Sequence, residues 1–168
     1  MKLQELNALP IEDFVDALST VFENSPWFSV HAVNERPFTS VEQLHEALCA
    51  AVEASPDAQK MALIKAHPDL AGKAALSGEL TGESTKEQKG AGLDRLSKDE
   101  FETFHNLNNA YQLKFGFPFI IAVKGHDKHS ILEAFRARLE NSETEEKAEA
   151  LKQIFKIANF RLEDLIQT

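Results

Sequence analysis

Apolar residues recur at spacings of three and four along most of the chain, which is the spacing of one face of an α-helix. The first such stretch predicts a helix that starts at Pro10, because proline suits the first helical turn. Pro26 is expected to end this helix. Its apolar positions are Ile11, Phe14, Val15, Leu18 and Phe22.

Serine followed three residues later by glutamate or glutamine marks several further helix starts, since the two side chains can cap each other's backbone N–H groups. This capping-box pattern occurs at Ser40 with Gln43, Ser84 with Glu87, Ser97 with Glu100, and Ser142 with Glu145. The first of these helices should run to about residue 52. The third should end at Gly116, a residue typical of the position after a helix.

Three more helical stretches complete the pattern. One begins at Ser55-Pro56 and is limited by Pro68, because the residue before a proline avoids the helical region. Another carries Ile131, Leu132, Phe135 and Leu139. The last runs from about residue 143 to the end, with one predicted apolar face: Ala148, Leu151, Phe155, Ala158, Leu162 and Leu165.

Two segments depart from helical spacing. Residues 69–83 contain three glycines (Gly72, Gly78 and Gly82), which predicts a broken helix or a loop. Residues 119–123 are strand-like but have no partner strand, so we interpret them as an extended, buried connector. The predicted fold class is therefore all-α: a single-domain irregular helical bundle, residues 1–168, with one short extended connector.

Composition and charge narrow the possible partners. The chain has 27 acidic and 18 basic residues, a formal net charge of -9, and no local stripe of lysine and arginine, which disfavours nucleic-acid binding. The single cysteine, Cys49, cannot form an intramolecular disulfide, which indicates a reduced, intracellular setting. There is no signal-peptide or membrane-spanning pattern and no Ser-Lys-Leu ending, so we expect a cytoplasmic protein.

His67 is the first candidate for chemistry. It lies at a helix end directly before Pro68, where its imidazole would be presented at a break between helix and loop. The alternative is a surface or helix-capping histidine, favoured there by the helix dipole.

The segment Ser84 to Gln88 is the second candidate. The N-terminus of a helix offers backbone N–H groups and a positive dipole end, which can hold an anionic or polar substrate. The alternative is that Ser84 and Glu87 only cap the helix.

Arg161 and the connector are the remaining candidates. Arg161 flanks the apolar face of the last helix, where its guanidinium needs an acidic partner or a ligand unless its head reaches water. The run Lys114-Phe115-Gly116-Phe117-Pro118-Phe119-Ile120-Ile121 would suit the wall of an apolar pocket whose backbone binds a flat heterocycle, or simply the core. No metal site is predicted, since His126 and His129 have no obvious further ligands.

Three blocks together resemble the family of 2-oxo-4-hydroxy-4-carboxy-5-ureidoimidazoline (OHCU) decarboxylases. In chain order they are His67-Pro68-Asp69-Leu70; Ser84-x-x-Glu87-Gln88 with Ala91-Gly92-Leu93; and Leu107-Asn108-x-x-Tyr111-x-x-Lys114-Phe115-Gly116-Phe117-Pro118-Phe119-Ile120. The last block is long and unusual, and the resemblance extends from the region of Phe14 to Arg161-Leu162.

The resemblance implies an all-helical homodimer that converts OHCU to (S)-allantoin and CO2 in urate breakdown, with no metal or organic cofactor. It implies that His67 is the catalytic acid, with Glu87 beside it, and that Arg161 binds the substrate. The further substrate contacts that it implies are Pro68, Ser84, Thr85, Lys86, Glu87, Gln88, Phe119, Ile120, Ile121, Ala122 and Val123. The alternative is a helical protein-interaction module, which would differ in whether His67, Glu87 and Arg161 converge on one pocket.

Overall fold

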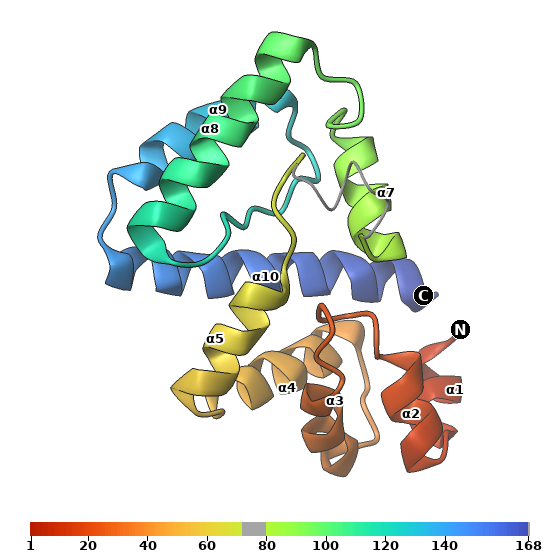
Figure 1. Cartoon of the computed structure of the whole chain (residues 1–168). Helices are drawn as coiled ribbons and strands as arrows, with labels where there is room; N and C mark the ends of the chain where they lie inside the picture. Colours follow the sequence, from red (N-terminus) through yellow and green to blue (C-terminus); the bar gives the residue numbers. More distant parts are fainter. Residues whose placement is uncertain (72–79, 168) are drawn as a thin grey trace. The chain divides into compact units, whose positions relative to one another are not determined.

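The computed structural model describes residues 1–71 and 80–167, and in these residues the backbone forms helices joined by turns, without a β-strand (Figure 1). The predicted all-α class is therefore confirmed. Backbone contacts divide the chain into two compact units, Met1–Ala66 with Phe155–Thr168, and His67–Ile154. The extent of one domain over residues 1–168 stays a prediction.

The first unit is built from short N-terminal helices and the end of the long C-terminal helix. Within it α3 packs against both α4 and α2, and α4 contacts α5. The elements are α1 (Leu3–Ala8), α2 (Ile11–Ala17), α3 (Trp27–Ala32), the 3-10 turn η1 (Val33–Glu35), α4 (Val41–Glu53), α5 (Asp57–Ala66) and the last turns of α10 (Glu143–Leu165).

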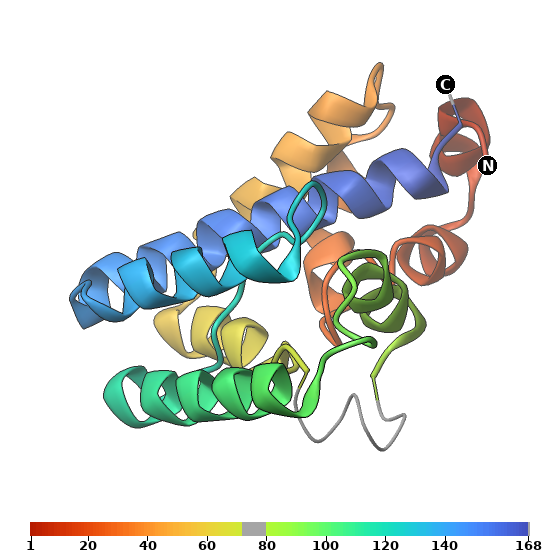
Figure 2. The same cartoon turned by 90° about the horizontal axis from the view of Figure 1, so that it is seen from above.

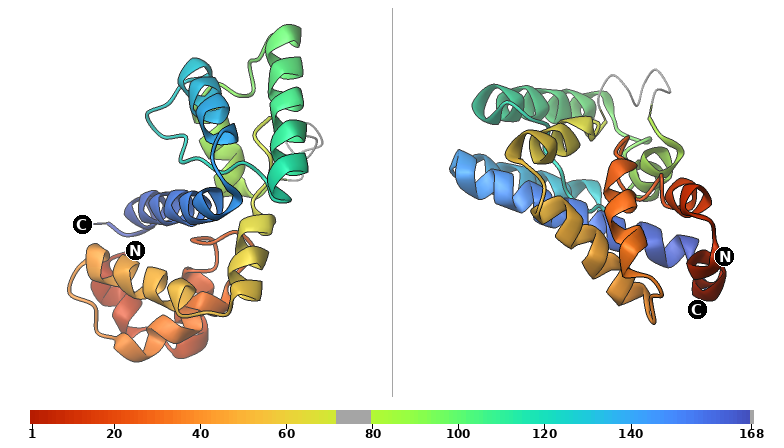
Figure 3. Two further views of the ribbon diagram at one scale, coloured as in Figure 1. Left: turned by 90° about the vertical axis from the view of Figure 1, so that its left-hand side faces the viewer. Right: turned by 90° about the horizontal axis from the view of Figure 1, so that it is seen from below.

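The two ends of the chain meet in this unit. The backbone N–H of Gln167 donates to the carbonyl of Met1 at 2.8 Å, and Lys2 and Gln167 form an isolated parallel bridge. Both views in Figure 3 accordingly show the N and C labels side by side.

The predicted helix between Pro10 and Pro26 is wrong in its extent. Helix α2 stops at Ala17, and the chain then turns until Pro26 opens α3 as its N-cap. Phe14, Leu18 and Phe22 are all buried, so they keep their place in the core although they do not share one helix. The apolar residues keep helical spacing across a turn, so the pattern alone predicted a helix that was too long.

The second unit holds α7 (Gly82–Gly90), α8 (Lys98–Phe115), α9 (Lys128–Leu139) and the first part of α10. Helices α8 and α9 contact each other, and the teal trace in Figure 2 leads from one to the other. The predicted start of α8 is confirmed by reciprocal hydrogen bonds between Ser97 and Glu100. Its predicted end is confirmed by Gly116, which has a φ of 77° that favours glycine.

The core of this unit is aromatic. Tyr111 lies at its centre, with ring centroids of Phe115, Phe117, Phe119 and Phe135 between 4.5 and 6.0 Å away. Phe119 and Phe135 stack on each other at 3.8 Å. The aromatic run of the sequence therefore contributes to the core, as one of its two interpretations required.

The predicted apolar face of α10 is displaced from the observed one. Ala148 is exposed and Leu151, Phe155 and Leu165 are only half-buried. The buried stripe follows Glu146, Ala150, Gln153, Ile154, Ile157, Ala158, Arg161 and Leu162. Polar residues occupy part of this stripe because they bind buried backbone and charged groups, so an apolar pattern could not reveal it.

Most of the predicted loop at residues 69–83 lies outside the described residues. Leu70 and Ala71 form a turn shortly after α5, and Gly82 is already helical, since it begins α7.

Candidate active site

His67 directly follows α5 and is buried, with 7% of its surface exposed. The interpretation as a surface histidine is therefore wrong. The backbone of His67 is restricted by Pro68, because the proline ring keeps the preceding residue out of the helical region. A helix end on one side and a proline on the other thus restrict the backbone that carries this buried imidazole.

Helix α7 starts three residues earlier than the sequence predicted. Its N-cap is Thr81, whose hydroxyl accepts a hydrogen bond from the backbone N–H of Ser84 at 3.2 Å. Ser84 lies in the first turn, and Glu87 lies in the second turn. The predicted capping box of Ser84 and Glu87 is therefore wrong, and helix capping no longer explains why a glutamate stands at position 87.

The inward face of α7 carries three of the candidate residues. Ser84 and Gln88 are buried and Glu87 is half-buried, at the spacing of one helix face. Thr85 and Lys86 are exposed. Of the two, Thr85 lines the cavity described below, whereas Lys86 does not.

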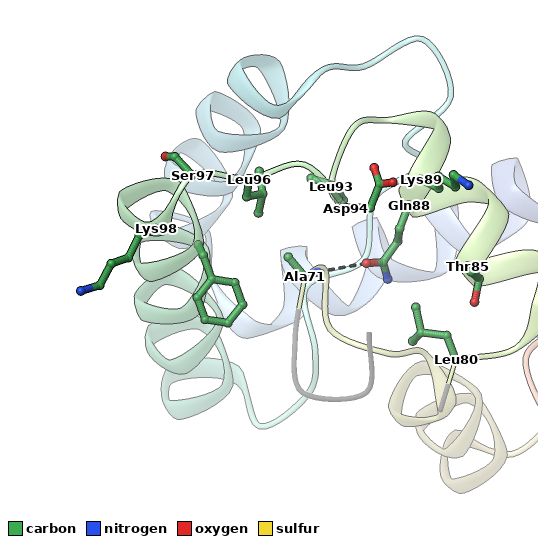
Figure 4. A pocket seen from close by; sticks show the side chains of 11 residues that line it. Ala71, Leu80, Thr85, Gln88, Lys89, Leu93, Asp94, Leu96, Ser97 and Lys98 are labelled. Atoms are coloured by element: carbon green, nitrogen blue, oxygen red, sulfur yellow. Dashed lines mark hydrogen bonds between the residues drawn. The ribbon is translucent and has the colours of Figure 1, made fainter. Parts of the chain in front are cut away.

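Gln88 joins α7 to the segment that follows His67. Its side-chain oxygen accepts from the backbone N–H of Ala71 at 3.0 Å, the contact drawn in Figure 4. Its side-chain nitrogen donates to the carbonyl of Asp69 at 3.2 Å. The structure therefore brings the His67 segment and the inward face of α7 together.

A cavity of about 590 Å³ lies beside this junction in the second unit. Its walls include Ala71, Thr85 and Gln88, together with the apolar side chains of Leu93 and Phe101 (Figure 4). The space next to Gln88 is thus mostly apolar, with a few polar groups at its edge, as in many sites for small molecules.

The connector from Phe119 to Val123 is extended and buried, as predicted. Its backbone is held at two points. The guanidinium of Arg138 donates to the carbonyl of Ile120 at 2.5 Å, and the N–H of Ala122 donates to the side-chain oxygen of Gln153 at 3.0 Å. Residue 121 lies between two anchored peptide groups.

A buried ion pair supports the first of these anchors. Arg138 donates through Nε to Glu146 at 2.8 Å, and the Tyr111 hydroxyl donates to the same carboxylate oxygen at 2.6 Å. Burial, and then the hydrogen bond to Glu146, raise the pKa of Tyr111, so the phenol stays protonated. The sequence reasoning missed this cluster, although Glu146, Ala150 and Gln153 have the three- and four-residue spacing of a helix face.

Arg161 belongs to the first unit and is buried, with 7% of its surface exposed. Its guanidinium donates to the carboxylate of Glu23 at 2.9 Å and to the carbonyl of Thr20 at 3.1 Å. The interpretation with its head in water is therefore wrong, and Glu23 is the acidic partner that the alternative required. Because His67 lies in the other unit, the convergence of Arg161 with His67 and Glu87 stays a prediction.

Two features of the described residues bear on other kinds of site. Residues 1–71 and 80–167 contain no cluster of three or more histidine, cysteine, aspartate or glutamate side chains that could hold a metal ion. Within the same residues, none of the helices combines the length and the apolar character needed to cross a membrane. Burial, with smaller contributions from Glu53 and Glu46, raises the pKa of Cys49 to about 12, so its thiol is a poor nucleophile near neutral pH.

The buried histidine, the inward face of α7 and the buried connector all belong to the second unit of an all-α protein. The sequence profile of OHCU decarboxylase matches residues 7–163, which include every candidate site residue. The chain belongs to the OHCU decarboxylase family.

Individual relatives support the same assignment. The chain is 40% identical over 165 residues to the 2-oxo-4-hydroxy-4-carboxy-5-ureidoimidazoline decarboxylase of Halalkalicoccus jeotgali, covering 98% of this chain and 92% of the relative. A crystal structure of (S)-allantoin synthase matches with a TM-score of 0.81 and 30% identity, covering 100% of this chain and 55% of that chain. A crystal structure of OHCU decarboxylase in the presence of (S)-allantoin matches with a TM-score of 0.69 over 89% of this chain and 96% of that chain; at 20% identity it supports the fold alone.

Proposed function

We propose that this protein decarboxylates OHCU to (S)-allantoin and CO2 in urate breakdown, without a metal or an organic cofactor. The observation that carries this proposal is the family match over residues 7–163. The buried position of His67 and the inward face of α7 supply the groups that such a reaction needs.

The substrate itself can accept the electrons of decarboxylation. In OHCU the carboxylate is attached to a hydroxyl-bearing carbon next to a C=N bond. When the bond to the carboxylate breaks, its electron pair forms a C=C bond to the neighbouring carbon and moves the C=N pair onto nitrogen, which takes up a proton. The product of this step is an enol-enamine, so the reaction needs no external electron sink of the kind that organic cofactors supply.

His67 then delivers a proton to the ureido-bearing carbon, on one face only, while the enol hydroxyl loses its proton and becomes a carbonyl. Imidazole is suited to proton transfer near neutral pH. Because only 7% of His67 is exposed, bulk water has little access to compete as an unselective proton donor. This restriction supports a single enantiomer as the product.

Glu87 orients the imidazole or the substrate hydroxyl, and Arg161 binds oxygen atoms of the ring or the ureido group. Contact between Arg161 and the departing carboxylate would stabilise the ground state and slow the reaction. We assign the peptide groups around Ile121 to the substrate ring, since the neighbouring groups of Ile120 and Ala122 are held by Arg138 and Gln153. Pro68, Ser84, Thr85, Lys86 and Gln88 complete the proposed contacts.

The decisive experiment uses freshly generated OHCU, followed by circular dichroism with and without the protein. Faster decay together with a growing signal of (S)-allantoin is the expected result. Decay at the spontaneous rate to a racemic product would contradict the proposed function.

We also propose that the protein works as a homodimer in the cytoplasm. Light scattering coupled to size-exclusion chromatography measures the mass directly, and a mass of one chain would contradict the dimer. The acidic balance of the chain, 27 acidic to 18 basic residues, supports a small-molecule substrate over a nucleic acid.

A further inference from the structure

Three successive residues after His67-Pro68 have a backbone atom held by a side-chain amide. The carbonyl of Leu70 accepts from the side-chain nitrogen of Asn108 at 2.8 Å. On either side, the carbonyl of Asp69 and the N–H of Ala71 bind the two ends of the Gln88 amide, at 3.2 and 3.0 Å. All five residues belong to the second unit.

The backbone at this point adopts a conformation that a non-glycine residue rarely takes. Ala71 has a φ of 51° in the left-handed region, which is costly for a residue with a side chain. Such strain persists only where the surroundings fix the backbone, and it is most common at functional sites. The Gln88 and Asn108 amides provide this fixation next to the proposed proton donor.

Helix α8 presents one face to the same segment. Burial raises the pKa of Asp69, while a hydrogen bond from Gln112 and the charge of His105 lower it, so both side chains lie close to this carboxyl group. Residues 105, 108 and 112 have the spacing of one helix face. Asn108 is the buried member of this face, with 5% of its surface exposed.

The side chain of Asn108 carries an energetic cost that core packing does not explain. Its side-chain oxygen is buried and has no hydrogen-bond partner among residues 1–71 and 80–167. A buried acceptor without a partner destabilises a fold, and an apolar residue of similar size would avoid that penalty. An asparagine here is therefore better explained by what its side-chain nitrogen holds.

We propose that Asn108 is a positioning residue for the reaction. Together, Asn108 and Gln88 form a clamp that fixes the backbone of residues 69–71 and thereby orients His67 towards the substrate. The kinetic test of this proposal rests on the proposed function, whereas the hydrogen bonds of the clamp do not depend on it. Asn108 acts through His67, and the block Leu107-Asn108-x-x-Tyr111 of the sequence thereby acquires a role beyond core packing.

The test is Asn108→Leu, which keeps the branched shape of the side chain but removes the donor to Leu70. We expect kcat to fall between about 10- and 100-fold, with KM changed by less than about 3-fold, because a small displacement of a reacting group costs this much. The enantiomeric excess of allantoin should also fall. Asn106→Leu is the matched control, since Asn106 lies on the exposed side of the same helix, and it should retain the wild-type rate and enantiomeric excess.

Amide hydrogen exchange provides a second readout that needs no substrate. The N–H of Ala71, held by Gln88 in the wild type, should exchange faster in Asn108→Leu and remain slow in Asn106→Leu. Faster exchange with an inactive wild type would contradict the proposed function and leave the clamp supported. Unchanged exchange, or full rate and enantiomeric excess in a folded Asn108→Leu, would overturn the positioning role.

Discussion

Glu87 lies in the second turn of α7, beyond the cap that Thr81 provides, so its carboxylate is not needed to start the helix. We expect Glu87→Gln to lower kcat by about 100-fold or more, because proton transfer by a positioned side chain contributes about that much and the carboxylate orients the groups that take part in it. The melting temperature should change little, since the side chain is only half-buried and glutamine has the same size. Kinetics and thermal unfolding of one protein sample measure both quantities, and unchanged turnover would return Glu87 to a structural role.

His67 is the residue on which the stereochemistry depends. His67→Asn retains a hydrogen-bonding side chain but cannot act as an acid near pH 7. We expect the rate to fall close to the spontaneous one and the allantoin to become nearly racemic. In D2O the wild type should place deuterium at the ureido-bearing carbon of (S)-allantoin, as mass spectrometry or NMR can establish. Full enantiomeric excess from His67→Asn would assign the proton to another donor.

A change in the shape of the Arg161 side chain should weaken binding of the product, and the loss of Glu23 should destabilise the fold. Lysine at position 161 keeps the charge but not the planar fork that reaches Thr20 and Glu23 together, so affinity for (S)-allantoin should weaken in Arg161→Lys. Titration calorimetry measures that affinity. Glu23→Gln should instead lower the free energy of unfolding by roughly 3 kcal/mol, because it removes one charge of a buried ion pair. Equal affinity in Arg161→Lys would argue that the arginine is structural.

The chemistry of single positions was only partly visible in the sequence. The type and chain position of His67 and Glu87 made them candidates, whereas Glu23, Asn108, Arg138 and Gln153 were missed. Their roles depend on buried contacts with residues distant in sequence; Glu23, for example, lies 138 positions before Arg161. Local pattern carries no information on such a pairing.

At the scale of elements, α8 begins with a cap that is also tied to α9. Glu100 accepts from the backbone N–H of Ser97 at 2.9 Å and pairs with Lys128 at 2.7 Å. The hydrogen bond from Lys128, and then that from Ser97, hold the pKa of Glu100 at about 2, against an ordinary value of 4.5. A lowered pKa means that this stabilisation is complete above about pH 4.5 and is lost as the pH falls towards 2.

Glu100→Gln tests this pH dependence. Glutamine can still accept from Ser97, but it loses the ionic attraction to Lys128. We expect the variant to melt below the wild type at pH 6 and the difference to shrink between pH 4.5 and 2, because acid removes the same interaction from the wild type. Melting temperatures over that pH range measure the difference, and a gap that stays constant with pH would contradict the ionic role.

The sequence predicted the helix starts correctly where a nearby side chain caps the backbone. Ser40, Ser97 and Ser142 each accept from the N–H three residues later, as predicted. At α7 the same signal misled, because Thr81 lies three residues before Ser84 and competes for the same role. The short helices α1 and α3 were missed, since helices of six residues are too short to show a periodic pattern.

At the scale of the whole molecule, the proposed reaction should depend on the protein alone. We expect activity to survive treatment with EDTA followed by gel filtration into metal-free buffer, because the substrate contains its own electron sink. The assay is the same circular-dichroism measurement, with and without added divalent ions. Activity that disappears with EDTA and returns with one metal would contradict the cofactor-free mechanism.

The contact between the two ends of the chain has a topological consequence. Since Met1 and Gln167 are already hydrogen-bonded, a short peptide linker could join the ends into a ring with little loss of chain entropy. Such a ring could then be opened at an exposed loop elsewhere, which gives the same helices in a permuted order. The order in which the helices occur along the gene is therefore separable from the way in which they pack.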